Sequence, residues 1–141
     1  MILTMDNVRE VFLSELPEVR KWAESTFGPD YDLDEEASES YLLFEDVVKK
    51  LLFKLLEDGT AENLLTSLFR FFERMAISSD GDVVDLLGIA ILEPLVFRQE
   101  SVREAWKHIG PKTRELIIAE AQHHGRLDSL PPGVQTSLHE H

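Results

Sequence analysis

The 141-residue sequence predicts an all-α protein: a single compact bundle of about seven short-to-medium antiparallel helices, or a short solenoid-like stack of them. Three observations support this fold class. Apolar residues recur at spacings of three and four along most of the chain, whereas no segment alternates as a strand does. Turns of three to five residues separate the periodic segments, so successive helices should run roughly antiparallel. No exact repeat is present, so the stack stays an alternative to the bundle.

Two helices are expected first. Asp6 or Asn7 can cap a helix whose apolar face is formed by Val8, Val11, Phe12 and Leu16. Pro17 suits the first turn of a second helix over 17–26, because its missing N–H would be unsatisfied there anyway. Gly28 and Pro29 end that helix.

A long helix over about 37–57 follows an acidic connector at residues 30–39. Its apolar residues form one broad stripe and comprise Tyr41, Phe44, Val47, Val48, Leu51, Leu52, Leu55 and Leu56. Gly59 is a plausible C-terminal cap, and Thr60 can cap the next helix.

The helix over 61–77 is the most apolar and is expected at the centre of the fold, contacted on two sides. Residues 79–82 form a turn. Asp82, with Asp85 three residues on, resembles a cap for an apolar helix over 83–92, which Pro94 should bend or end.

Two further helices complete the predicted domain, 1–125. Ser101 and Glu104 fit the capping-box pattern for one that ends at Gly110. Pro111 opens the last helix, which stops at Gly125. The remainder, 126–141, carries isolated apolar residues and is predicted to be a flexible C-terminal tail.

The chain is strongly acidic, with 14 Lys and Arg against 27 Asp and Glu and a net charge of −13. Residues 1–60 carry 15 acidic and 6 basic side chains, so the acidity is concentrated there. Such a field repels phosphate backbones, which argues against nucleic acid, and it steers a basic protein partner instead. The simpler alternative is that the charge serves solubility.

Other function classes are excluded by composition. There is no Cys, hence no disulfide or thiolate site. The longest uncharged apolar run is too short for a membrane span, and the first residues lack the features of a secretory signal. The expectation is a cytoplasmic protein with no membrane partner.

The connector carries the candidate partner-binding residues, which are Asp30, Asp32, Asp34, Glu35, Glu36 and Glu39. Its Asp-x-Asp-x-Asp start resembles a calcium loop. However, an EF-hand needs Gly at the sixth position and Glu at the twelfth, where this chain has Glu35 and Tyr41. An exposed acidic loop without a ligand and a contact for a basic partner remain the two interpretations.

Glu73 and Glu93 lie in apolar surroundings and are predicted to be structural buried carboxylates, as ion-pair or capping groups. The alternative is acid–base chemistry, for which no nucleophile is placed beside them. Glu120 precedes His123 and His124 with metal-ligand spacing, but no second copy of the motif exists. We therefore predict no metal, no cofactor and no enzyme.

The most distinctive string covers residues 64–97, LLTSLFRFFERMAISSDGDVVDLLGIAILEPLVF. It resembles a largely uncharacterised bacterial all-helical family with a Phe-Phe-Glu element, a Gly-Asp turn and a Leu-Glu-x-Leu helix end. The first element is matched here by Phe71, Phe72 and Glu73, the turn by Gly81 and Asp82, and the helix end by Leu92, Glu93 and Leu95. Some members resemble immunity proteins of bacterial toxin systems, which implies a toxin-binding role.

These observations together predict a non-catalytic acidic binding protein, an immunity-type inhibitor that masks a cationic toxin domain. The alternative is a helical scaffold or adaptor, which can also self-associate, with its contact made by the apolar faces of 61–77 and 83–92 or by the C-terminal tail. A monomer and a homodimer are both compatible with the sequence.

Overall fold

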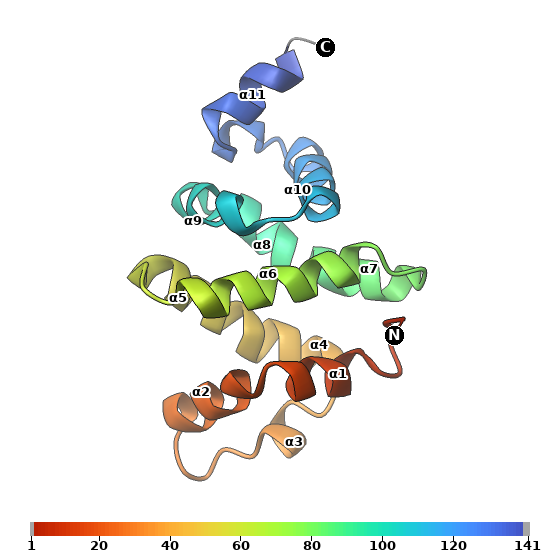
Figure 1. Ribbon diagram of the computed structural model, residues 1–141, viewed down its shortest axis with the longest axis vertical. Coiled ribbons are helices and arrows are strands. Elements are labelled where there is room, and N and C mark those ends of the chain that lie inside the picture. The colour runs from red at the N-terminus through yellow and green to blue at the C-terminus, as the bar shows by residue number, and fades with distance from the viewer. Residues whose placement is uncertain (1, 140–141) are drawn as a thin grey trace.

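The computed structural model describes the backbone of residues 2–139 and the side chains up to residue 136. Within 2–139 it contains helices and turns and no strand, so the predicted all-α class is confirmed. The helices form successive layers along the long axis, from α2 and α3 at one end to α11 at the other (Figure 1). The elements are α1 (Val8–Glu15), α2 (Pro17–Phe27), α3 (Leu33–Glu36), α4 (Ser40–Leu42), η1 (Leu43–Val48), α5 (Lys49–Asp58), α6 (Glu62–Ala76), α7 (Gly81–Leu87), η2 (Gly88–Leu92), α8 (Glu93–Val96), α9 (Gln99–Ala105), η3 (Trp106–His108), α10 (Pro111–His123), η4 (Leu127–Ser129) and α11 (Pro132–His139).

The central position predicted for α6 is confirmed. It packs against α5 and α7 and also against α10, which lies on the side of the later layers (Figure 1). Its apolar residues are almost completely buried, namely Leu65, Leu68, Phe69, Phe71, Phe72, Met75 and Ala76. The apolar circumference of this helix is therefore used by the fold of the chain itself.

Phe12 joins the first layer to the centre. Its ring centroid lies 5.0 Å from that of Phe44 in η1 and 5.0 Å from that of Phe71 in α6, and all three side chains are buried. Aromatic pairs at this separation, tilted or edge to face, stabilise beyond the area they bury. These contacts fix α1 on the core and so position the acidic connector that follows α2.

Pro94 was predicted to bend or end its helix, and it does not end it, because helical structure continues from Gly81 to Val96 through α7, η2 and α8. The turn before Pro94 is widened to π geometry, and the Glu93 N–H donates to the carbonyl of Gly88, five residues back. A widened turn removes the close approach between a proline ring and the carbonyl four residues earlier. The helix can therefore pass Pro94 uninterrupted.

Three predicted caps are wrong. The N-cap position of α6 is Ala61 rather than Thr60, and no side chain caps that helix. Asp80, not Asp82, caps α7, since its carboxylate accepts the N–H of Asp82. The helix predicted to start at Ser101 begins two residues earlier, at Gln99, and no side chain caps it. By contrast, Gly59 ends α5 in the left-handed conformation, with φ of 67°, as expected for a C-terminal cap.

The segment predicted as a flexible tail starts with residues that pack on the domain. Leu130 is fully buried, and the Arg103 guanidinium donates to the carbonyls of Asp128 and Ser129. The ordered fold thus extends past residue 125, at least to Leu130. The mobility of the last residues stays a prediction.

No helix within residues 2–139 has the length and apolar character that crossing a bilayer requires.

Candidate functional site

The acidic connector lies at one end of the stack, where α3 folds against α1 and α2 (Figure 1). Two of its carboxylates, Asp32 and Asp34, hold the connector in place through hydrogen bonds. Asp32 caps α3 by accepting the N–H of Asp34 at 3.0 Å. Arg9, whose side chain is only 12% exposed, donates to the carbonyls of Leu33 and Ala37 and so ties α3 to α1.

Asp34 is held by two arginines. Both of its oxygens accept from Arg20 at 3.1 Å, and Arg9 donates to Oδ1 at 3.2 Å. Hydrogen bonds from Arg20 and then Arg9 hold the pKa of the Asp34 carboxyl below its usual value. Asp32 and Asp34 therefore stabilise the connector, a role that the sequence did not separate from partner binding.

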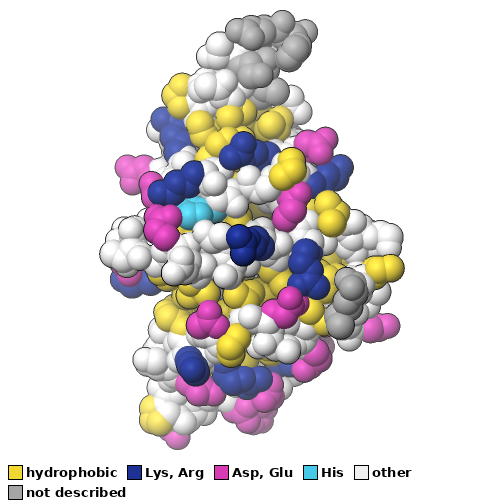
Figure 2. All heavy atoms as spheres, in the orientation of Figure 1, with side chains coloured by type: hydrophobic (Ala, Val, Ile, Leu, Met, Phe, Trp, Pro, Cys, Tyr) yellow, Lys and Arg dark blue, Asp and Glu magenta, His cyan; other side chains and the backbone are white. Residues whose placement is uncertain are grey.

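The other four predicted residues, Asp30, Glu35, Glu36 and Glu39, are exposed and form no ion pair within the described part of the chain. We call these four side chains the acidic end. Figure 2 shows Asp and Glu side chains gathered around basic ones over the part of this face formed by α1–α3. Two arginines of the neighbouring helices, Arg9 and Arg20, both pair with Asp34 rather than with these four side chains.

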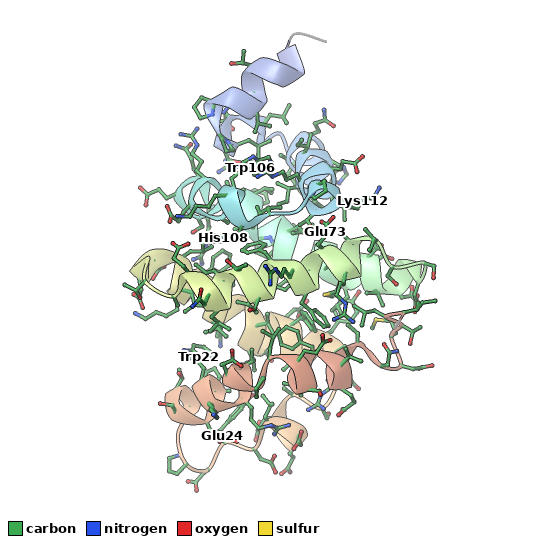
Figure 3. The ribbon with its side chains drawn as sticks, viewed as in Figure 1. Trp22, Glu24, Glu73, Trp106, His108 and Lys112 are labelled. Carbon is green, nitrogen blue, oxygen red and sulfur yellow. The ribbon has the colours of Figure 1, made fainter. Side chains whose placement is uncertain are left out.

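An aromatic cluster lies beside the acidic end. The ring of Phe27 lies 5.7 Å from that of Trp22 and 4.8 Å from that of Tyr31. Phe27 is 36% exposed, and the other two are partly buried against the core. Burial, and then the charges of Glu36 and Asp46, raise the pKa of Tyr31. Figure 3 shows Trp22 and Glu24 on α2 at this end of the molecule.

Glu73 serves a different purpose, and Figure 3 shows it near Lys112 at the start of α10. Its carboxylate accepts the N–H of Lys112 at 3.0 Å, and the N–H and hydroxyl of Thr113 at 2.8 Å each. It thus caps α10 from another helix. Glu73 is partly rather than fully buried. Burial raises the pKa of Glu73, but the hydrogen bonds from Thr113 and Lys112 outweigh it and lower the pKa overall.

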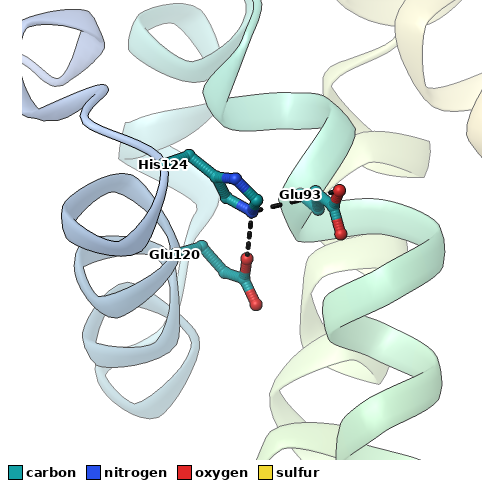
Figure 4. Close-up of side chains that lie close together, drawn as sticks. All are labelled: Glu93, Glu120 and His124. Atoms are coloured by element: carbon teal, nitrogen blue, oxygen red, sulfur yellow. Dashed lines mark ion pairs between the residues drawn. The ribbon is translucent and has the colours of Figure 1, made fainter.

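Glu93 is less buried than predicted, since its side chain is 44% exposed. Its apolar sequence neighbours point into the core, whereas Glu93 itself faces α10. There it meets Glu120 and His124 (Figure 4). The His124 Nε2 atom lies 3.3 Å from Glu120 Oε2 and 3.9 Å from Glu93 Oε1. Sequence spacing indicated the pair on α10, but nothing in the sequence placed Glu93 with it.

One comparison with known proteins gives a match. A family model described as "Domain of unknown function (DUF7674)" matches residues 9–125, which include the acidic end, the aromatic cluster, Glu73, Glu93, Glu120 and His124. No curated protein and no solved structure matches the chain.

Proposed function

The chain belongs to the family with that description, and from its geometry we propose that it is a non-catalytic binding protein whose acidic end docks a cationic protein. The observation that carries the proposal is the excess of acidic over basic side chains in residues 1–39. Residues 1–39 hold 11 acidic and 3 basic side chains. Two of the three bases, Arg9 and Arg20, are engaged by Asp34, which leaves Lys21 as the third base against the exposed carboxylates of these residues.

A surface of this kind accelerates association with a basic partner. Exposed carboxylates at one end of a molecule create a potential that draws a positively charged protein toward that end. Charges at an interface rim contribute mainly to the association rate and to its salt dependence.

The aromatic cluster would supply the affinity that rim charges do not. Trp and Tyr are enriched among the few residues that carry most of the binding energy at protein interfaces. Trp22, Phe27 and Tyr31 contact one another beside the acidic end and expose part of their surface. Lys50 lies 5.5 Å above the Phe27 ring, so this ring already accepts a cation on one face.

The finer form of the proposal is an immunity-type inhibitor, as the resemblance of residues 64–97 implies. The partner would be a toxin domain with a cationic active surface, such as a nuclease, and the acidic end would cover the site that otherwise binds phosphate. The support for this form is the sign and location of the charge. A bacterial origin is implied by the same resemblance, and the cytoplasmic setting is the expectation from composition; both belong to the same proposal.

The alternative function is a helical scaffold or adaptor that self-associates. The apolar residues of 61–77 and 83–92 suggested this alternative. Most of their side chains are buried in the core of the chain itself. Ile77 and Ile89 are the exceptions, 65% and 51% exposed. Light scattering separates the two functions: a stable homo-oligomer supports the scaffold, and a monomer supports the inhibitor.

The structure defines the variant that tests the docking proposal. Asp30→Asn, Glu35→Gln, Glu36→Gln and Glu39→Gln together neutralise the acidic end while retaining Asp32 and Asp34, which hold the connector in place. The matched control removes four other exposed carboxylates that form no ion pair in the described residues: Asp82→Asn, Asp85→Asn, Glu100→Gln and Asp128→Asn.

Both variants change the net charge equally, so a solubility role predicts the same behaviour for both. Docking predicts that the acidic-end variant associates with its basic partner roughly tenfold more slowly at low salt, while the control stays near the wild type. Equal rates for all three proteins would refute the assignment of this surface.

A further inference from the structure

The contact between α8 and α10 contains a set of side chains that the proposed function does not use. Glu120 and His124 are four residues apart on α10 and so lie on one face of that helix. Glu93, the first residue of α8, faces them across the gap between the two helices (Figure 4). One ligand atom of each residue, two carboxylate oxygens and one imidazole nitrogen, lies within 4.8 Å of the others.

One distance between ligand atoms matches that in a first coordination sphere, a second is longer, and all of them are within 4.8 Å. Zinc binds His nitrogen and carboxylate oxygen at about 2.0–2.2 Å, so neighbouring ligand atoms of a tetrahedral site lie about 3.3–3.5 Å apart. The separation of His124 Nε2 from Glu120 Oε2 is already 3.3 Å, and that from Glu93 Oε1 is 3.9 Å. The partly exposed Glu93 side chain needs only a small rotation to complete the set.

The charge of the cluster favours a cation. Neither Glu93 nor Glu120 forms an ion pair with a Lys or Arg in the described part of the chain, and both approach only His124. Two carboxylates facing one imidazole leave excess negative charge between two packed helices. A divalent ion would neutralise it, since a bound cation is often the largest charge in such a site.

Two features of the surroundings support a built site. The π turn η2 ends at Leu92, directly before Glu93, and such turns are frequent at functional sites. The His124 ring contacts the Phe97 ring, with centroids 5.3 Å apart, which restricts its orientation.

An open position lies beside Glu120. A hollow of about 200 Å³ is bordered by Gly88, Ile89, Leu116 and Glu120. Gly88 lines this hollow, and a Cβ atom added there would make only ordinary van der Waals contact with Glu120, 3.5 Å from its Oε1 atom. Of the three side chains only Glu120 lines this hollow, so water can reach the cluster from the side of Glu120.

We propose that Glu93, Glu120 and His124 bind one divalent transition-metal ion of the zinc class, with water in the remaining position. One imidazole and two carboxylates suit zinc and its first-row neighbours better than calcium or magnesium, which prefer oxygen ligands alone. The ion would cross-link α8 and α10.

The test is titration of the full chain with Zn²⁺ by calorimetry, with native mass spectrometry for stoichiometry. All proteins carry His139→Ala and His141→Ala, so that the C-terminal histidines do not contribute. Glu93→Gln, Glu120→Gln and His124→Ala each remove one ligand. Glu100→Gln is the control, because Glu100 is an exposed carboxylate that forms no ion pair in the described residues and is not one of the three ligands.

The expected result is one Zn²⁺ per chain, an affinity at least about tenfold weaker in each ligand variant, and no change in the control. Circular dichroism confirms that the near-isosteric Gln variants are folded. The visible spectrum of bound Co²⁺ should report a low-coordinate site with one nitrogen ligand, which His124→Ala abolishes. The proposal is overturned if the parent protein binds no Zn²⁺, or if the three ligand variants bind it as tightly as the control does.

Discussion

Replacing Glu73 by Ala should destabilise the fold markedly, although Glu73 lies outside the proposed docking surface and the proposed metal site. The carboxylate accepts three hydrogen bonds at the start of α10. Loss of a helix cap costs about 1 kcal/mol. Thr113 is fully buried, so its N–H and hydroxyl would lose a partner that water cannot easily replace, which costs roughly 1–3 kcal/mol more.

Because Glu73 is partly exposed, the lower half of this range applies, and we expect a total loss of about 2–3 kcal/mol in the free energy of unfolding. For a chain of this length that corresponds to a decrease in Tm of roughly 10 °C. Urea denaturation followed by circular dichroism measures the loss. A change below about 0.5 kcal/mol, the usual size for surface substitutions, would show that Glu73 does not hold α10.

The pH dependence of the free energy of unfolding reports the contribution of the ionised Glu73 carboxylate. The folded pKa of Glu73 lies below the ordinary value of 4.5, so its contribution is complete above that pH and is lost as the pH falls through the folded pKa. Glu73→Gln removes the titration but keeps the size of the side chain. The stability difference between wild type and Glu73→Gln should therefore shrink in acid, and a difference that stays constant with pH would contradict the hydrogen-bond explanation.

Three further predictions follow from individual contacts. Gly110→Ala would place a Cβ atom 2.7 Å from Glu73 Oε1. It should therefore lower the free energy of unfolding by about 2 kcal/mol in the wild type but by nearly nothing in a Glu73→Ala background. Equal losses in the two backgrounds of this double-mutant cycle would refute the clash. Leu130→Ala should cost about 2–5 kcal/mol in urea denaturation because Leu130 is fully buried, whereas a negligible cost would restore the flexible tail from residue 126. Asp34→Asn should cost at most about 1 kcal/mol, since the Asp34 carboxylate is itself exposed. High salt should reduce that cost, and a cost that salt does not change would argue against ion pairing.

Local patterns predicted the helices well because most apolar residues of this chain follow one helical face. The stripe that predicted a helix over 37–57 corresponds to continuous helical structure from Ser40 to Asp58. The main difference concerned Pro94, where a rule based on α-helical geometry misses the π turn that accommodates the ring. That turn depends on the packing of η2 against α10 and η1, which local spacing does not contain.

The functional residues were predictable only where they are neighbours in sequence. The acidic connector was located by composition, but its division into structural and exposed carboxylates depends on Arg9 and Arg20, which come from α1 and α2. Glu120 and His124 were noticed through their spacing, while the third member, Glu93, is contributed by another helix. The cap that Glu73 provides for α10 is likewise a tertiary contact between distant segments.

The central claim is that the acidic end selects a cationic protein, and capture from cytosol of the source cell with three baits tests it most directly. The baits are the wild type, the variant with Asp30, Glu35, Glu36 and Glu39 neutralised, and the control with four carboxylates neutralised elsewhere. The account predicts that one basic protein is enriched equally by the wild type and the control, is lost from the acidic-end variant, and is released from the wild type by moderate salt. The claim is contradicted if all three baits capture the same proteins in the same amounts.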